Sequence, residues 1–208
     1  LFEIMESVKI SVVVTVLDEA KTIGSLLDSL LGQSKKADEI IVVDGGSGDK
    51  RSLAGGASKT VQIIKHYQKK DRKIKLLSEK GNIAHGRNTG IEVARHDIIA
   101  TTDAGCIPHP DWLEKITHPF ERIHPRGVHA ATSWESAERQ ESPSPSEESS
   151  VGLVAGFYEM PTRTPMQKAV SVFLGIPSER YDPATFLPST RSVAFKKQLW
   201  EKVGGFNE

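Results

Sequence analysis

Two runs of β-branched residues, joined by one amphipathic segment, constrain the fold of this chain most. Residues 9–17 (KISVVVTVL) and 39–44 (EIIVVD) are short and almost continuously apolar, which is typical of strands buried on both faces of a parallel sheet. Between them, residues 23–31 carry leucine and isoleucine at the three-and-four spacing of a helix, and Gly32 is placed to end it. Two parallel strands joined by a helix form a right-handed βαβ unit, so the sequence predicts an α/β fold.

A third apolar run ends on an aspartate, as the second does. Residues 97–102 lead into Asp103, and Gly105 follows two residues later, which predicts a buried strand carrying a carboxylate at its carboxyl end. Ligands of open α/β sheets bind outside the carboxyl ends of the strands, and a carboxylate there suits Mg²⁺ or Mn²⁺ carrying a phosphate. The alternative is a turn aspartate that caps the helix expected to begin near Pro110.

Two weaker features accompany these strands. Residues 45–49 (GGSGD) form a glycine-rich turn that would let a ligand approach the backbone, but a plain surface turn would look the same. Arg87 lies in residues 82–95, which have helical spacing but contain glycines that predict an irregular N-terminal half. Arg87 is either a solvated helix residue or a cation near the phosphates or base of a nucleotide.

The remaining elements follow from periodicity and from Gly and Pro positions. We expect a helix at 58–69, a strand at 73–77, a helix at 111–121, a strand at 127–134, an extended segment at 151–160, a helix at 164–174, a loop running into a strand at 186–195, and a helix at 198–203. Residues 133–150 are rich in Ser, Pro and Glu and predict a surface loop.

Composition narrows the class of protein. The 27 basic and 27 acidic residues cancel, so no nucleic-acid partner held by bulk charge is expected. A single cysteine, Cys106, excludes an internal disulfide. No apolar run approaches the roughly 20 residues that span a bilayer.

Four segments together resemble family 2 glycosyltransferases of the GT-A fold: residues 10–33, 39–49, 86–105 and 192–206, in that order and over nearly the whole chain. The resemblance implies a Rossmann-like, nucleotide-sugar-binding α/β fold, with a mostly parallel central sheet flanked by helices. We expect a single domain over 1–208. Residues 1–106 would form its nucleotide-binding half and residues 107–208 an acceptor-side half, incomplete at the C-terminus.

The resemblance also implies a nucleotide site. By position, Asp44 corresponds to the family's aspartate at the nucleotide base, and Arg87 to the basic residue that approaches the nucleotide. The first-strand tip that lines the nucleotide corresponds to Thr15 and to the run from Leu17 to Glu19, which includes Asp18. These residues are therefore expected to be nucleotide-binding.

Asp103 resembles the first carboxylate of the family's D-x-D motif, which holds a divalent metal ion on the diphosphate, and Arg191 with residues 188–190 resembles the loop that closes over donor and acceptor. The third position of the motif is Gly105, where aspartate is more usual. The family's catalytic base is a carboxylate soon after the Gly-Gly-Phe segment. Since the chain stops at Glu208, we expect the base beyond residue 208 and assign no catalytic residue.

The function implied is transfer of a sugar, with inversion, from a UDP- or GDP-sugar donor to a saccharide or lipid-linked acceptor, assisted by Mg²⁺ or Mn²⁺. The expected location is the cytoplasm, at or near the inner face of the membrane, with peripheral membrane association left open. One alternative is a sugar nucleotidyltransferase, which would need a glycine-rich basic loop where Leu17, Asp18 and Glu19 stand. Another is a non-catalytic nucleotide-binding domain, which Gly105 and the missing base favour. The dinucleotide fingerprint of an NAD oxidoreductase is absent.

Overall fold

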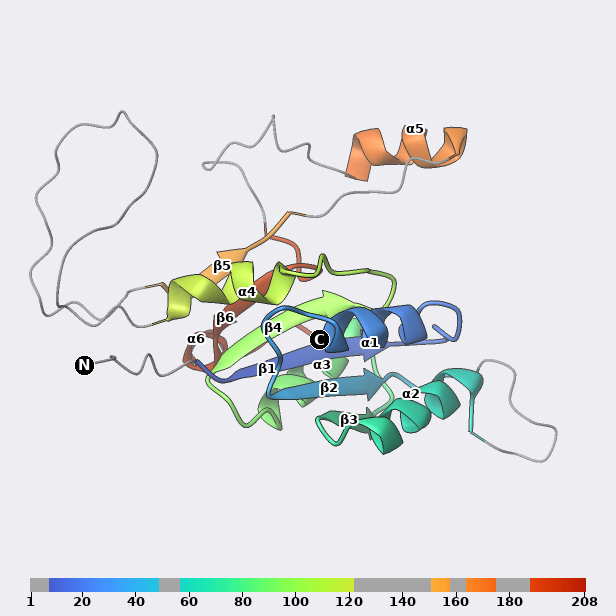
Figure 1. Ribbon diagram of the computed structural model, residues 1–208, viewed down its shortest axis with the longest axis horizontal. Coiled ribbons are helices and arrows are strands. Elements are labelled where there is room, and N and C mark those ends of the chain that lie inside the picture. Colours follow the sequence, from blue (N-terminus) through green and yellow to red (C-terminus); the bar gives the residue numbers. More distant parts are fainter. Residues whose placement is uncertain (1–7, 49–56, 122–150, 158–163, 175–187) are drawn as a thin grey trace, which may run out of the picture.

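One mixed sheet forms the centre of the molecule. The computed structural model describes residues 8–48, 57–121, 151–157, 164–174 and 188–208 (Figure 1). The six strands, in the order β3-β2-β1-β4-β6-β5 across the sheet, are β1 (Ile10–Val16), β2 (Glu39–Asp44), β3 (Ile74–Ser78), β4 (Ile98–Asp103), β5 (Leu153–Ala155) and β6 (Val193–Lys196). Strands β1 to β4 are parallel, β6 runs antiparallel to β4, and β5 runs antiparallel to β6. The predicted α/β fold with a mostly parallel sheet is confirmed.

Helices cover both faces of this sheet. One face carries α1 (Ile23–Leu31), α2 (Lys59–Lys70), α4 (Trp112–Thr117) and the 3₁₀ turn η1 (His118–Phe120); the other carries α3 (Ile83–Glu92) and α6 (Lys197–Val203), while α5 (Pro165–Leu174) follows β5 in the chain. Among the described residues, we find no helix with the length and hydropathy of a membrane-spanning segment.

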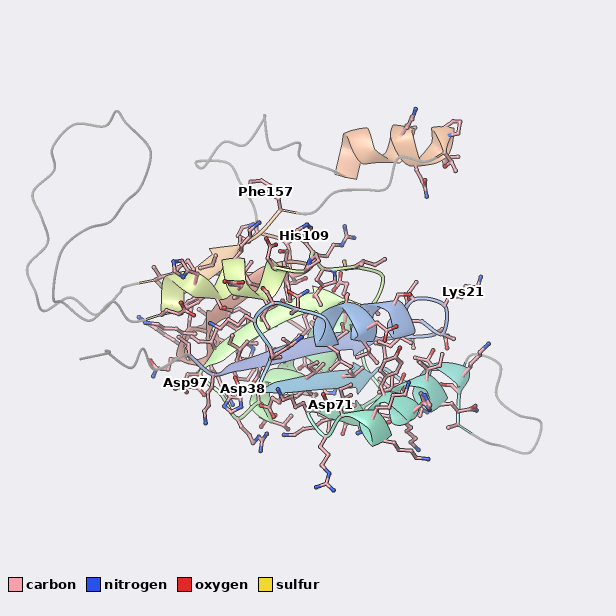
Figure 2. All side chains as sticks on the ribbon, in the orientation of Figure 1. Lys21, Asp38, Asp71, Asp97, His109 and Phe157 are labelled. Carbon is pink, nitrogen blue, oxygen red and sulfur yellow. The ribbon has the colours of Figure 1, made fainter. Side chains whose placement is uncertain are left out.

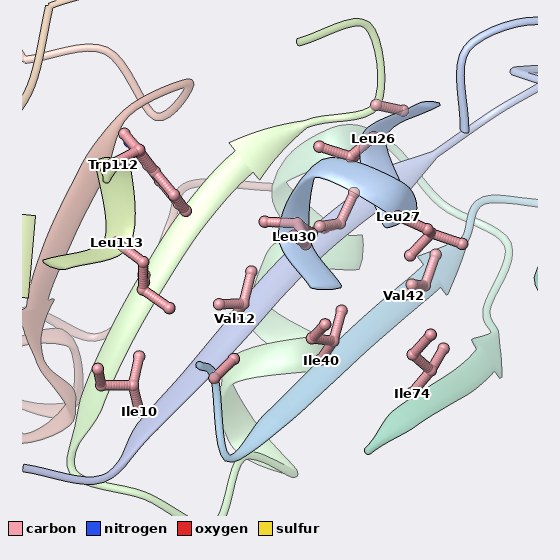
Figure 3. Close-up of a cluster of buried hydrophobic side chains, with 14 of the residues drawn as sticks. Ile10, Val12, Leu26, Leu27, Leu30, Ile40, Val42, Ile74, Trp112 and Leu113 are labelled. Carbon is pink, nitrogen blue, oxygen red and sulfur yellow. The ribbon is translucent and has the colours of Figure 1, made fainter. Parts of the chain in front are cut away.

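The larger core lies between the sheet and the α1 face. Figure 3 shows leucines of α1 directed at side chains of β1, β2 and β3, with Trp112 and Leu113 of α4 at the side of β4. Leu26, Leu27 and Leu30 of α1 are at most 2% exposed, in agreement with their three-and-four spacing. Since both faces of the first strands are covered, the continuous apolar runs in the sequence are explained.

Helix α3 differs from the sequence prediction. Gly86 and Gly90 predict an irregular N-terminal half, but α3 is regular from Ile83, and the Asn82 side chain caps it by accepting a hydrogen bond from the His85 backbone N–H, 2.8 Å long. A Cβ atom on Gly90 would lie 2.6 Å from a methyl carbon of Val13, so glycine lets this helix pack directly on β1. The glycines mark close packing, and the predicted irregularity is wrong.

Most other predicted elements lie within a residue or two of their observed bounds. The expected helix at 111–121 is shorter, because α4 ends at Thr117 and continues as the 3₁₀ turn η1. The predicted strand at 127–134 and the loop at 133–150 lie outside the described residues.

Candidate functional site

The strand order reverses between β1 and β4, and this switch point is where open α/β sheets bind ligands. Strand register pairs Thr15 with Asp103 across this boundary, and Val16 with Asp44 on the other side of β1. Paired residues share a face and neighbours in a strand alternate. Thr15 and Asp103 therefore face α3, whereas Asp44 shares the α1 face with Val16, which is part of the larger core.

Two arginines hold the Asp103 carboxylate. Arg87 Nη2 of α3 donates to Oδ1 at 2.7 Å, and Arg191 Nε lies 3.4 Å from Oδ2. Arg87 is only 8% exposed, so the alternative of a solvated helix residue is wrong. The alternative that Asp103 caps the next helix is also wrong, since α4 begins only after Asp111. Two guanidinium groups around one carboxylate leave a surplus of positive charge, which favours an anionic ligand.

The Arg87 guanidinium also lies against an aromatic ring. Its Cζ atom is 6.0 Å from the centre of the Phe206 ring, within the range of a cation–π contact. Phe206 belongs to the Gly-Gly-Phe segment after α6, so a residue far along the chain supports the arginine. This segment is one of the family motifs, but the motif by itself indicates no contact with Arg87.

Asp44 organises the glycine-rich turn after β2. Its carboxylate accepts hydrogen bonds from the backbone N–H of Ser47, at 3.1 Å, and from the Ser47 hydroxyl. The Ser47 hydroxyl oxygen in turn accepts from the Asp18 backbone N–H at 2.9 Å, and Asp18 Oδ1 accepts from the Gly48 N–H at 2.7 Å. Asp18 has a φ of 56°, the one positive φ among the described non-glycine residues. The loops after β1 and β2 are thus joined by a polar network whose linking residue, Ser47, sequence reasoning missed.

The side chains at the end of the first strand lie in different environments. Thr15 Oγ1 is the one buried side-chain polar atom in the described residues that has no hydrogen-bond partner. Leu17 is 57% exposed, and the Glu19 side chain accepts from the Thr22 hydroxyl at the start of α1. The structure therefore brings Thr15, Arg87, Asp103 and Arg191 together, joins Asp44 to the same edge through Ser47 and Asp18, and directs Glu19 towards α1.

Asp103 is the residue that the sequence predicts as the metal ligand. No group of three or more His, Cys, Asp or Glu residues that could hold a metal occurs within the described ranges. Mg²⁺ needs only one or two protein carboxylates when the substrate supplies phosphate oxygens. The Asp103 side chain is 26% exposed, and its longer contact is with Arg191, the more exposed arginine. A single-ligand site at Asp103 therefore fits, provided that Arg191 moves aside.

An apolar cavity of about 310 Å³ adjoins this cluster. It lies beside β6, α6 and the turn that carries Arg191, and its walls include Val193, Phe195, Trp200 and Phe206. Phe206, whose ring lies against the Arg87 guanidinium, forms part of the cavity wall.

The chain belongs to Glycosyl transferase family 2, whose family model matches residues 11–174. This confirms the family that the sequence motifs indicate. Among curated proteins, it is 33% identical over 111 residues to the glycosyltransferase AglE of Haloferax volcanii, covering 51% of this chain and 33% of that protein. It is 33% identical over 125 residues to the amylovoran biosynthesis glycosyltransferase AmsB of Erwinia amylovora, covering 59% of this chain and 39% of that protein.

Solved structures share the fold. The mannosyltransferase PcManGT from Pyrobaculum calidifontis, in complex with GDP-Man and Mn²⁺, superposes with a TM-score of 0.59 at 22% identity, over 96% of this chain and 47% of that one. TarS 1-349 of S. aureus, in complex with UDP-GlcNAc, gives 0.54 at 17% identity, over 96% and 48%. The chain thus spans about half the length of these structures and less of the curated relatives.

Proposed function

We propose that this chain binds a nucleotide-sugar donor at the β1/β4 switch point and transfers the sugar, with inversion, to a saccharide or lipid-linked acceptor. The observation that carries the proposal is the cluster of Arg87, Arg191 and Asp103 at the carboxyl end of β4. It is supported by membership of the family and by the GDP-Man and UDP-GlcNAc donors of the two fold relatives.

The leaving group explains why two arginines belong here. A nucleoside diphosphate departs with negative charge on its phosphates, and preorganised cations stabilise such developing charge. Arg87 is already held by Asp103 and Phe206, so little reorganisation is needed for it to face the phosphates. Arg191, which is less buried, is the arginine that would shift towards them.

A divalent cation, Mg²⁺ or Mn²⁺, is proposed to be held by Asp103 together with the phosphate oxygens of the donor. When bound, it would neutralise part of the charge on the departing diphosphate. Asp44, Ser47 and Asp18 would shape the pocket for the base and ribose, because their network fixes the two loops that border it.

The acceptor hydroxyl must lose its proton as it attacks the anomeric carbon, because its pKa lies far above 7. A positioned carboxylate supplies this general base in the proposed single displacement, which needs no covalent sugar–enzyme intermediate. We assign this role to none of the described carboxylates. The identity of the acceptor and the cellular location stay predictions.

A second candidate is a nucleotide-binding domain that performs no transfer. Gly105 stands where the family usually has an aspartate, and both oxygens of Asp103 contact arginines. These two observations favour binding without metal-assisted chemistry.

The test is calorimetric titration of the protein with UDP and with GDP, each with Mn²⁺ and with EDTA. We expect one nucleotide to bind at least tenfold more tightly with Mn²⁺. Asp103→Asn should remove that gain, because the neutral amide is a poor ligand for a hard cation. The matched control is Asp97→Asn, the same change at the other end of the strand (Figure 2).

The outcomes separate the candidates. If neither nucleotide binds, the nucleotide-sugar proposal is wrong. If EDTA and Asp103→Asn leave the affinity unchanged, the metal role is wrong. Nucleotide release from UDP- or GDP-sugars, followed with a panel of acceptors, then distinguishes transfer from binding alone.

A further inference from the structure

The Asn88 side chain fastens the end of the described chain to α3. Its Oδ1 atom accepts from the Phe206 backbone N–H at 2.8 Å and from Trp200 Nε1 at 3.2 Å. Its Nδ2 atom donates to the Phe206 carbonyl at 2.9 Å and to Glu208 Oε1 at 3.0 Å. An amide has two donor hydrogens and two acceptor lone pairs, so every hydrogen-bonding position of Asn88 is used.

The partners of Asn88 are all more than 100 residues away in sequence, and the backbone is shaped to reach it. Gly204 and Gly205 have φ values of 81° and 84°, in the left-handed region that favours glycine. A Cβ atom on Gly205 would lie 3.0 Å from Asn88 Oδ1. The paired glycines therefore allow Phe206 to present both its N–H and its C=O to one side chain.

Holding the Phe206 backbone also fixes the position of its ring. The ring lies against the Arg87 guanidinium, and Arg87 donates to Asp103. Asn88 and Arg87 are neighbours on α3, so the chain of contacts runs from Asn88 through Phe206 back to Arg87 and on to the strand end. A guanidinium supported on one side by a ring and on the other by a carboxylate has little freedom to turn.

We propose that Asn88 is a positioning residue: by clamping Phe206 it holds the Arg87 guanidinium in the orientation that receives the phosphates of the nucleotide. This inference rests on the proposed function for the role of the phosphates, but the orientation of Arg87 can be measured without any ligand. Glu208 adds to the clamp, and hydrogen bonds from Asn88 and then His85 hold the pKa of its carboxyl below the ordinary value.

The first test is a double-mutant cycle on nucleotide affinity. Asn88→Ala should weaken binding of UDP or GDP about tenfold when Arg87 is present, and less than twofold in the Arg87→Gln background. A purely structural asparagine would weaken binding by the same factor in both backgrounds, and that result would overturn the proposal. Asn82→Ala is the matched control, since it removes the cap of the same helix without contacting Phe206.

A second variant separates the effect of the hydrogen bonds to the Phe206 backbone from the effect of the Phe206 ring. Phe206→Leu keeps the backbone bonds to Asn88 but removes the aromatic face, and it should weaken binding as much as Asn88→Ala does. This variant also covers the case in which Asn88→Ala fails to fold. Full affinity in Phe206→Leu would contradict the proposed route through the ring.

The second test needs no nucleotide. Hydrogen exchange of the Arg87 guanidinium, followed by NMR in ¹⁵N-labelled protein, should be at least tenfold faster in Phe206→Leu and Asn88→Ala than in wild type and Asn82→Ala. Unchanged exchange would overturn the positioning role. If wild type binds neither UDP nor GDP, the proposed function fails while this measurement still judges the role of Asn88.

Discussion

At the scale of single residues, Ser47 connects the two loops that border the proposed base pocket. Its hydroxyl donates to Asp44 and accepts from the Asp18 backbone, and Asp44 itself is only 4% exposed. A buried carboxylate that loses one donor is costly, because its desolvation is no longer offset. Asp18, which has a φ of 56°, takes part in the same network through its backbone N–H and its carboxylate.

Ser47→Ala is therefore expected to weaken nucleotide affinity roughly tenfold, or about 1.4 kcal/mol, because binding must then order the two loops that Ser47 already joins in the wild type. Calorimetric titration measures this. The control is Ser29→Ala, whose hydroxyl donates to the Leu26 carbonyl within α1, and whose loss should leave the affinity unchanged. Equal affinities in both variants would mean that the loop network plays no part in binding.

Residue identities at the site are predictable in part. Asp44 and Asp103 end apolar runs, so the sequence alone places both at the carboxyl edge of the sheet, where the strands do end. The Arg87–Asp103 pair is not predictable in this way, because it depends on how α3 rotates over the sheet. The hydrogen bonds between Asn88 and Phe206 join residues more than 100 positions apart in the sequence, which no local pattern encodes.

At the scale of elements, the packing of α3 on the sheet sets the position of Arg87. Gly86 and Gly90 face β1 and β2, and a Cβ atom on Gly90 would lie 2.6 Å from Val13 and 3.1 Å from Val43. Glycine has a low helix propensity, so the sequence predicts an irregular N-terminal half for this helix, and that prediction is wrong. Close packing between helix and sheet outweighs the propensity cost.

Gly90→Ala tests this balance. Alanine improves helix propensity by about 1 kcal/mol, but overpacking against Val13 costs about 1–3 kcal/mol, so we expect a net loss of stability and weaker nucleotide binding as α3 shifts. Gly24→Ala in α1 is the control, since its nearest new contact would be 3.8 Å away. That variant should gain about 0.4–1 kcal/mol in urea denaturation. Stabilisation of both variants would refute close packing as the reason for Gly90.

At the scale of the whole molecule, the two ends of the parallel strands differ in role. The proposed site lies at the carboxyl ends, and a buried ionic cluster lies at the amino ends, where Asp38 and Asp97 are labelled in Figure 2. Glu39, which is 0% exposed, accepts hydrogen bonds from the Ser11 hydroxyl at 2.7 Å, from Lys75 at 2.6 Å, and from the backbone and side chain of Arg95 at 2.6 and 3.0 Å. Strand β2 separates the cluster from the site by roughly 16 Å, at about 3.3 Å per residue.

The ionic cluster should make the stability of the protein depend on pH without affecting the site. Burial by itself raises the pKa of Glu39, but the hydrogen bonds from Lys75, Arg95 and Ser11 outweigh it and lower the pKa from 4.5 to about 2. A carboxyl whose pKa is lower in the folded state stabilises the fold above its unfolded pKa and loses that contribution as the pH falls towards 2. The shift corresponds to roughly 3 kcal/mol.

Urea denaturation from pH 7 to pH 2 measures this contribution. Glu39→Gln should be less stable than wild type at pH 7. Wild type should lose roughly 3 kcal/mol of its unfolding free energy through Glu39 between pH 4.5 and 2, and Glu39→Gln should not show this loss. Its nucleotide affinity at pH 7 should be unchanged, because the cluster and the site lie at opposite ends of the strands. Glu79→Gln, at an exposed position just after β3, should behave as wild type in both measurements. If the stability of Glu39→Gln fell with pH as much as that of wild type, other carboxylates would account for the acid sensitivity. If Glu39→Gln bound the nucleotide more weakly, the separation between a stabilising end and a binding end of the strands would be wrong.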